Sequence, residues 1–192
     1  MQDMNELGRT VSRAVETLRQ GGVILYPTDT IWGLGSSIEH PEAFCHLLDL
    51  KGRPTSQALI LLVASIDMLR KYVPSLSEQT EQLIRDSERP LTLIFPHSVG
   101  IDNRFKACDG SIGIRVVRHR FCRILIETLR HPITSTSANI HGHPYKGYES
   151  IPESITSGVD YAVPRQYDET TDGRLPSRIL RLETKGYTVI RD

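Results

Sequence analysis

Lys51 and Arg53 stand two residues apart in the segment LKGRP, after an expected helix. In an extended chain that spacing points both cations to the same side, as binding of a polyphosphate would require. Cations are also favoured at helix C-termini without any ligand. For this segment alone, both interpretations stand.

Arg115 lies inside an apolar run, residues 112–117, that alternates as a strand does. Ile112, Ile114 and Val116 share one face of that strand, which leaves Arg115 on the other. An unpaired buried charge is costly, so this guanidinium must be paired within the protein or bind a ligand. Four basic residues come after this strand: Arg118, His119, Arg120 and Arg123. They form either a solvated helix start or an RNA-facing patch.

Two further segments place short polar side chains where an apolar strand ends. Residues 26–35 read YPTDTIWGLG, with Thr28, Asp29 and Thr30 directly after the strand. Residues 134–139 read TSTSAN, small hydroxyl groups that allow close approach of a phosphate or ribose. Ligands of open α/β sheets sit at such strand ends, but turns that satisfy their own backbone use the same residue types. Both explanations remain open for each segment alone.

Several familiar site signatures are absent from the sequence. There is no G-x-x-x-x-G-K-(S/T) phosphate loop, and the third glycine of a dinucleotide fingerprint would fall on Ile38. His141 and His143 bracket a glycine in an expected loop without an evident third ligand. A surface loop is therefore favoured there, and no metal site is predicted.

The composition is that of an ordinary globular protein, with 192 residues, 39% hydrophobic and 24% charged. Zero formal net charge gives no overall field toward nucleic acid or anionic lipid. Cys45, Cys108 and Cys122 contain no C-x-x-C pair, which favours free thiols in a reducing compartment. No secretory signal and no membrane-length apolar stretch is present, so we expect a cytoplasmic protein without a membrane partner.

The elements that must position these segments alternate between helices and strands. Periodicity and capping predict helices at 9–20, 41–50, 66–72, from Ser77, at 119–130 and at 152–157. Apolar runs predict strands at 23–26, 58–63, 91–95, 112–117, 132–137, 159–163, 177–182 and 187–191. This alternation predicts one α/β domain over residues 1–192 with a mixed sheet.

Together and in order, the four segments resemble the YrdC family from about Gly21 to Arg191. YPTDTIWGLG is similar to that family's YPT-(D/E)-T-x-(Y/F/W)-G-L-G loop, and LKGRP to its K-x-R motif. IGIRV resembles its G-x-R-x strand, and STSAN its S-x-N motif. The resemblance implies a twisted mixed sheet flanked by helices around a large positively charged cavity.

The resemblance also implies an activity, that of an L-threonylcarbamoyladenylate synthase. In that reaction L-threonine and bicarbonate or CO₂ give a carbamate, which attacks the α-phosphorus of ATP and releases pyrophosphate. Mg²⁺ would accompany ATP, and a downstream transferase would pass the labile product to tRNA as threonylcarbamoyladenosine forms. Such a transfer needs positioning and charge stabilisation rather than a covalent nucleophile.

The family's functional positions fall on residues of this chain. Those implied to bind ATP are Lys51, Arg53, Gln57, Ser135, Ser137, Asn139, Tyr145 and Arg191, of which Lys51 and Arg53 would also stabilise charge in catalysis. Those implied to bind L-threonine are Thr30, Arg115 and Ser177, with Arg115 on the carboxylate.

The sequence departs from the family pattern at several places. Ala58-Leu59 replaces Pro-Leu, Arg89 replaces a glycine before Pro90, Arg178 replaces a threonine, and Leu62 replaces a polar group of some members. The chain ends after Arg191-Asp192, so we expect no extra C-terminal domain. Two alternatives are a non-catalytic RNA-binding relative and a carbamoyl-adenylate enzyme that acts on a different amine.

Overall fold

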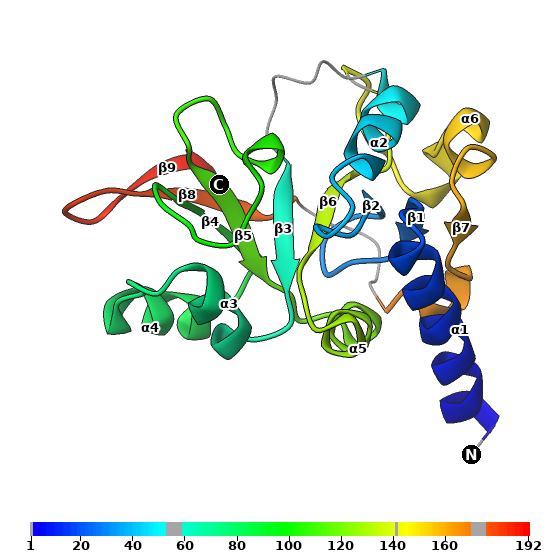
Figure 1. Cartoon of the computed structure of the whole chain (residues 1–192), viewed down its shortest axis with the longest axis horizontal. Coiled ribbons are helices and arrows are strands. Elements are labelled where there is room, and N and C mark those ends of the chain that lie inside the picture. The colour runs from blue at the N-terminus through cyan, green and yellow to red at the C-terminus, as the bar shows by residue number, and fades with distance from the viewer. Residues whose placement is uncertain (1, 53–58, 141, 170–175) are drawn as a thin grey trace.

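Nine strands form one sheet in the computed structural model, which describes residues 2–52, 59–140, 142–169 and 176–192 (Figure 1). The strands are β1 (Ile24–Tyr26), β2 (Gly33–Gly35), β3 (Ile60–Val63), β4 (Leu91–Phe95), β5 (Ile112–Val116), β6 (Ile133–Ser137), β7 (Tyr161–Ala162), β8 (Arg178–Leu182) and β9 (Tyr187–Arg191). Their order is β7-β1-β2-β6-β3-β5-β4-β8-β9. The pairs β1–β7, β3–β5 and β4–β8 are parallel and the others antiparallel, which confirms the predicted mixed α/β sheet.

Helices cover the sheet on both sides. They are α1 (Gln2–Arg19), α2 (Ala43–Lys51), α3 (Ile66–Tyr72), α4 (Glu78–Asp86), α5 (Arg120–Leu129) and α6 (Glu153–Thr156). Figure 1 shows α3, α4 and α5 along the lower side of the sheet and α2 and α6 on the upper side. Within the described residues, none of the helices has both the length and the apolar character needed to cross a bilayer.

Local capping explains where two of these helices begin. The Ser65 and Ser77 hydroxyl oxygens accept hydrogen bonds from the first-turn amides of α3 and α4, as predicted for Ser77. The other starts differ from prediction, since α1 begins at Gln2 instead of residue 9 and α2 at Ala43 instead of residue 41. These shifts leave the segments that carry the motifs in their expected order.

Strand β2 was predicted to be part of a loop, and that prediction was wrong. A Cβ atom on Gly35 would lie 2.5 Å from the Thr134 carbonyl oxygen and 2.8 Å from the Tyr26 ring, closer than such atoms approach. Glycine therefore lets β2 pass between β1 and β6, while the Tyr26 hydroxyl donates to the Thr134 carbonyl oxygen at 3.2 Å. A strand of Gly-Leu-Gly carries no apolar alternation, so pattern analysis misses it.

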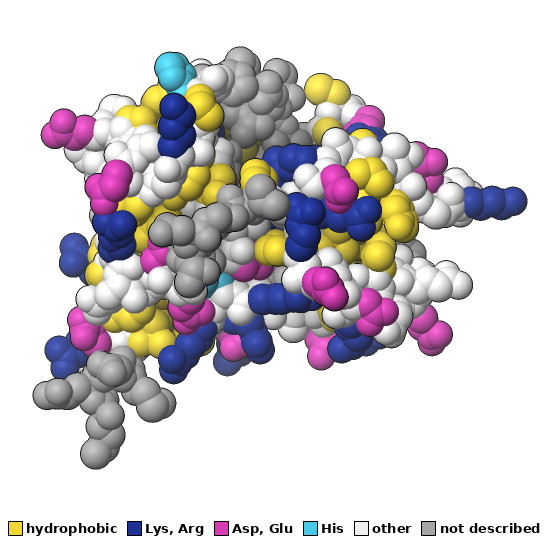
Figure 2. All heavy atoms as spheres, turned by 180° about the vertical axis from the view of Figure 1, so that it is seen from behind, with side chains coloured by type: hydrophobic (Ala, Val, Ile, Leu, Met, Phe, Trp, Pro, Cys, Tyr) yellow, Lys and Arg dark blue, Asp and Glu magenta, His cyan; other side chains and the backbone are white. Residues whose placement is uncertain are grey.

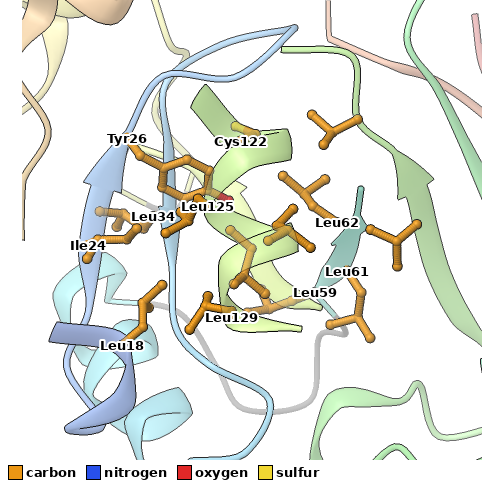
Figure 3. Close-up of a cluster of buried hydrophobic side chains, with 14 of the residues drawn as sticks. Leu18, Ile24, Tyr26, Leu34, Leu59, Leu61, Leu62, Cys122, Leu125 and Leu129 are labelled. Carbon is orange, nitrogen blue, oxygen red and sulfur yellow. The ribbon is translucent and has the colours of Figure 1, made fainter. Parts of the chain in front are cut away.

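The hydrophobic core lies between α5 and the first strands of the sheet. Figure 3 shows Cys122 and Leu125 of α5 beside Tyr26 and Leu34, all of them fully buried. Burial of one large apolar side chain contributes about 1.5–3 kcal/mol. This core fixes β1 and β2, and hence the loop between them that carries Thr28, Asp29 and Thr30.

We expect the native protein to react with iodoacetamide at two thiols and at a third only after denaturation. Cys45 and Cys108 are exposed, whereas Cys122 is buried and donates from Sγ to the Pro27 carbonyl oxygen at 3.1 Å. Burial raises the pKa of the Cys122 thiol well above its usual value, so the reactive thiolate is scarce at neutral pH. Mass spectrometry counts the adducts, and a Cys122→Ala variant should give two in both states. Three adducts formed at equal rates in the native wild type would contradict this burial.

Candidate active site

A cavity of about 580 Å³ brings together most of the residues that the sequence predicted. Those in its wall are Thr30, Arg115, Ser135, Ser137, Asn139, Tyr145, Ser177 and Arg191. The rest of the wall is formed by Thr28, Ile31, Trp32, Gly33, Leu59, Ile60, Thr136, Pro144, Pro176 and Ile179. Residues far apart in sequence meet here because β2, β6, β3 and β5 are neighbours in the sheet and β8 and β9 follow at its edge.

A second hollow of about 650 Å³ lies between α4 and the hairpin formed by β8 and β9. Among the residues that the structure describes, none of the predicted site residues lines it, and its wall contains no Lys or Arg. The cavity of about 580 Å³ combines the predicted site residues with two arginines, Arg115 and Arg191, and is therefore the candidate site for an anionic ligand.

Arg115 is held by the loop between β1 and β2. Its Nη2 atom lies 3.1 Å from Asp29 Oδ1, and its Nη1 atom donates to Thr30 Oγ1 at 3.2 Å. The side chains of Arg115 and Asp29 are only 3% and 9% exposed. Asp29 Oδ2 also accepts from the Arg118 backbone amide at 3.1 Å, which fixes the carboxylate. The predicted need of Arg115 for a partner is confirmed, and the paired guanidinium still forms part of the cavity wall.

Arg191 reaches the cavity from the other end of the chain. Its Nε donates to the Ser177 carbonyl oxygen at 3.0 Å, and its Nη2 donates to the Ser177 hydroxyl at 3.3 Å. Partial burial and the nearby charge of Arg115 lower the pKa of Arg191. The two guanidinium groups therefore repel one another, and an anion bound in the cavity would relieve that repulsion.

Lys51 lies behind the cavity wall at the end of α2. It is 2% exposed, and its Nζ donates to the Ser137 carbonyl oxygen, to the Asn139 carbonyl oxygen at 2.7 Å and to Asn139 Oδ1 at 3.3 Å. The prediction that the chain is extended from Lys51 to Arg53 is wrong at Lys51 and Gly52, because Lys51 is helical and Gly52 adopts a φ of 55°. Arg53 and Gln57 lie outside the described residues, as does the Ala58 departure.

The other departures from the family pattern lie away from this cavity. Arg178 Nε is 2.9 Å from Asp192 Oδ1, and Arg89 Nη1 is 4.0 Å from the same oxygen. Leu62 is fully buried in the core and does not line the cavity (Figure 3). None of the three changes therefore adds a charge to the wall.

The arginines that follow β5 are also outside the cavity. The Arg118 guanidinium donates to the backbone carbonyl oxygens of Ile84 and Ser87, and Arg123 lies 3.8 Å from Glu127. Figure 2 shows a face on which Lys and Arg alternate with Asp and Glu instead of forming one broad basic patch. The contacts of Arg118 and Arg123 within the protein favour the solvated helix start over an RNA-facing patch.

Two polar residues that contact the site were given no role in the sequence-based prediction. Asp29 was noted in its loop but given no function, and Thr92, whose Oγ1 lies 2.8 Å from Ser177 Oγ, was not identified. Threonine is common in strands, so Thr92 in LTLIF gives no signal comparable to the charge that pointed to Arg115. In the part of the chain that the structure describes, no three His, Cys, Asp or Glu side chains are grouped as metal ligands.

Comparisons with known proteins bear on this geometry. The Sua5/YciO/YrdC family model, described as telomere recombination, matches residues 16–192. The threonylcarbamoyl-AMP synthase of Acinetobacter baumannii is 36% identical over 183 residues, which cover 91% of this chain and 95% of that protein.

Solved structures share the fold. P. abyssi Sua5 complexed with L-threonine superposes with a TM-score of 0.84 at 25% identity, over 94% of this chain and 53% of that one. The chain thus spans about half the length of P. abyssi Sua5. E. coli YciO superposes with a TM-score of 0.81 at 25% identity, over 96% of this chain and 89% of that one. On the evidence of its motifs, its fold and these matches, this chain belongs to the Sua5/YciO/YrdC family.

Proposed function

We propose that the protein is an L-threonylcarbamoyladenylate synthase, an enzyme that makes L-threonylcarbamoyl-AMP and pyrophosphate from L-threonine, bicarbonate or CO₂, and ATP. The observation that carries the proposal is the meeting of two arginines with Ser135, Ser137 and Asn139 around one cavity. The names of relatives that match over nine-tenths of the chain support the same activity.

The cavity suits an amino-acid carboxylate on one side. Guanidinium binds carboxylate in a planar, charge-assisted contact, so Arg115 would hold the L-threonine carboxylate and fix its orientation. Thr30 and Ser177 line the wall beside the two arginines and would complete the amino-acid site.

The other side of the cavity suits ATP. Ser135, Ser137 and Asn139 present short polar groups at the end of β6, where a phosphate can approach closely. Tyr145 would contribute a further ATP contact, and Arg191, which lies beside Ser177, would reach ATP from the amino-acid side. The family pattern also proposes Lys51, Arg53 and Gln57 as ATP contacts. Charge that develops on pyrophosphate would be stabilised by Lys51 and Arg53 without a covalent intermediate.

Mg²⁺ is proposed to enter as part of the ATP substrate. The described cavity wall offers hydroxyl and amide oxygens, and it contains no carboxylate. Mg²⁺ keeps several of its waters and binds substrate phosphates, so it would be held mainly by ATP and not by the described wall.

We further propose that residues 1–192 act as one domain in the cytoplasm. The adenylate product is labile, so a transferase that carries the threonylcarbamoyl group to tRNA should act next. This would make the reaction the first step of threonylcarbamoyladenosine formation in tRNA.

We expect pyrophosphate release to require ATP, L-threonine and bicarbonate together. A coupled pyrophosphate assay with each component omitted in turn measures this directly, because all three supply atoms to the product. An Arg123→Ala variant, changed on the exposed start of α5, serves as the matched control and should keep the wild-type rate. Pyrophosphate release that persists without L-threonine would refute the proposed reaction.

Two alternatives give different results in the same preparation. A non-catalytic RNA-binding relative would bind RNA with a steep salt dependence and would not bind ATP. An enzyme that acts on a different amine would release pyrophosphate with L-serine in preference to L-threonine.

A further inference from the structure

Two threonine hydroxyls in the loop between β1 and β2 form a hydrogen-bonded relay beside Arg115. Thr28 Oγ1 lies 2.7 Å from the Ile31 carbonyl oxygen and 3.0 Å from Thr30 Oγ1. It also accepts a hydrogen bond from the Thr30 backbone amide at 3.0 Å. Both side chains line the cavity, yet they are only 1% and 5% exposed.

The proton of each hydroxyl in this relay can be assigned by counting donors. A carbonyl oxygen only accepts, so the single proton of Thr28 must lie on the bond to Ile31. The contact between the two hydroxyls then needs the proton of Thr30, because Thr28 has none left. Arg115 Nη1 cannot accept, so Thr30 Oγ1 accepts from it at 3.2 Å.

This assignment leaves one free hydrogen-bonding site on Thr30 Oγ1. The hydroxyl gives its proton to Thr28 and one lone pair to Arg115, and its remaining lone pair is available to the cavity. A ligand atom that contacts Thr30 must therefore carry a proton. A ligand atom that only accepts, such as a carboxylate or keto oxygen, would face the remaining lone pair of Thr30 Oγ1, and its binding there would be disfavoured.

We infer that Thr28 is a positioning residue that turns the Thr30 hydroxyl into an acceptor for the α-nitrogen N–H of the amino-acid substrate. The inference rests on the proposed function, which places the substrate carboxylate on Arg115. Thr30 Oγ1 is a direct neighbour of that guanidinium, and the α-nitrogen is the donor nearest to an amino-acid carboxylate. Both the free amine and the carbamate formed from it keep an N–H, so the contact can persist as the carbamate forms.

The test compares Thr28→Val with Thr28→Ser. Valine has nearly the shape of threonine but no hydroxyl, so the Thr30 proton would turn toward the cavity and oppose the substrate N–H. We expect Thr28→Val to raise KM for L-threonine about tenfold while KM for ATP stays within about twofold, as the loss of one such contact predicts. Thr28→Ser keeps the hydroxyl and should stay within about twofold of wild type for both substrates. Equal KM values for L-threonine in Thr28→Val and Thr28→Ser, or equal losses for both substrates in Thr28→Val, would overturn the inference.

Substrate analogues test which ligand atom is the donor. The penalty of Thr28→Val should persist with L-2-aminobutyrate, which lacks the side-chain hydroxyl of threonine. If the penalty vanished with this analogue, the donor would be that hydroxyl and the assignment to the α-nitrogen would be wrong.

A measurement on the wild type keeps the test valid if Thr28→Val does not fold. L-2-hydroxybutyrate carries an O–H beside its carboxylate, whereas 2-oxobutyrate carries only an acceptor there. As competitors of L-threonine, the first should bind about tenfold more tightly than the second, and equal or reversed inhibition would contradict the proposed polarity. A wild-type protein that needs no L-threonine for pyrophosphate release would instead refute the proposed function, so the two failures are distinct.

Discussion

Arg115→Met and Asp29→Asn should each destabilise the protein by about 3–5 kcal/mol, because each leaves a buried partner without its counter-charge. The two side chains are 3% and 9% exposed, so the charge that remains would be only poorly solvated. Chemical denaturation monitored by fluorescence or circular dichroism measures the change in unfolding free energy. The exposed pair Arg123–Glu127 is the matched control, and Arg123→Met should change stability by no more than about 0.5 kcal/mol.

The double variant separates the ion pair from other effects of the two substitutions. Asp29→Asn combined with Arg115→Met removes both charges at once, so its loss of stability should be smaller than the sum of the single losses by about 2 kcal/mol or more. Strict additivity would mean that the two side chains do not interact in solution.

Activity and stability should change differently among the single and double variants of Asp29 and Arg115. The double variant regains part of its stability, but it still lacks the guanidinium proposed to bind the L-threonine carboxylate. We therefore expect kcat/KM for L-threonine to stay at least about 100-fold below wild type in both variants that carry the Arg115→Met substitution, as expected for loss of a buried charge-assisted contact. Recovery of activity in the double variant would rule out this role of Arg115.

Much of the fold could be predicted because its strands are apolar and its helices periodic. The strands at 60–63, 91–95 and 112–116 fall within the apolar runs predicted at 58–63, 91–95 and 112–117. Strand β2 could not be predicted in this way, because glycine at Gly35 is selected by the approach of Tyr26 and Thr134 from other strands. Such a contact depends on tertiary structure, and local pattern does not contain it.

The candidate site was predictable in its members but only partly in its geometry. A partner for Arg115 was predictable because its charge interrupts an apolar strand. That partner, Asp29, lies in a loop 86 residues earlier in the chain (115 − 29 = 86). Local sequence patterns carry no information about such long-range pairs. The spacing of Lys51 and Arg53 was misinterpreted because local structure was predicted wrongly. The prediction assumed an extended chain, but Lys51 is the last residue of a helix and Gly52 adopts a left-handed conformation.

The geometry of Lys51 suggests that it has a second task besides supplying charge. An ammonium group has three N–H donors, and three oxygen atoms of Ser137 and Asn139 lie within its reach. These contacts tie the end of α2 to the segment that would receive the ATP phosphates. We therefore expect Lys51 to position Ser137 and Asn139 as well as to attract the phosphates.

Lys51→Met should lower turnover at least about 100-fold and destabilise the protein by about 1–3 kcal/mol. The lost stability follows because methionine matches the length of the side chain but leaves buried oxygen atoms without a donor. Lys51→Arg keeps the charge, but its planar fork cannot place donors as a compact ammonium does. Turnover in Lys51→Arg should therefore also remain low.

Thermal or chemical denaturation, together with ATP titration, separates the two roles. If the Lys51→Met protein had wild-type stability and a raised KM for ATP, Lys51 would bind phosphate and would have no structural role. Wild-type turnover in Lys51→Arg would lead to the same conclusion, because charge alone would then suffice. Loss of stability and turnover together, in a variant that still folds, would locate the function of Lys51 in the link between α2 and the end of β6.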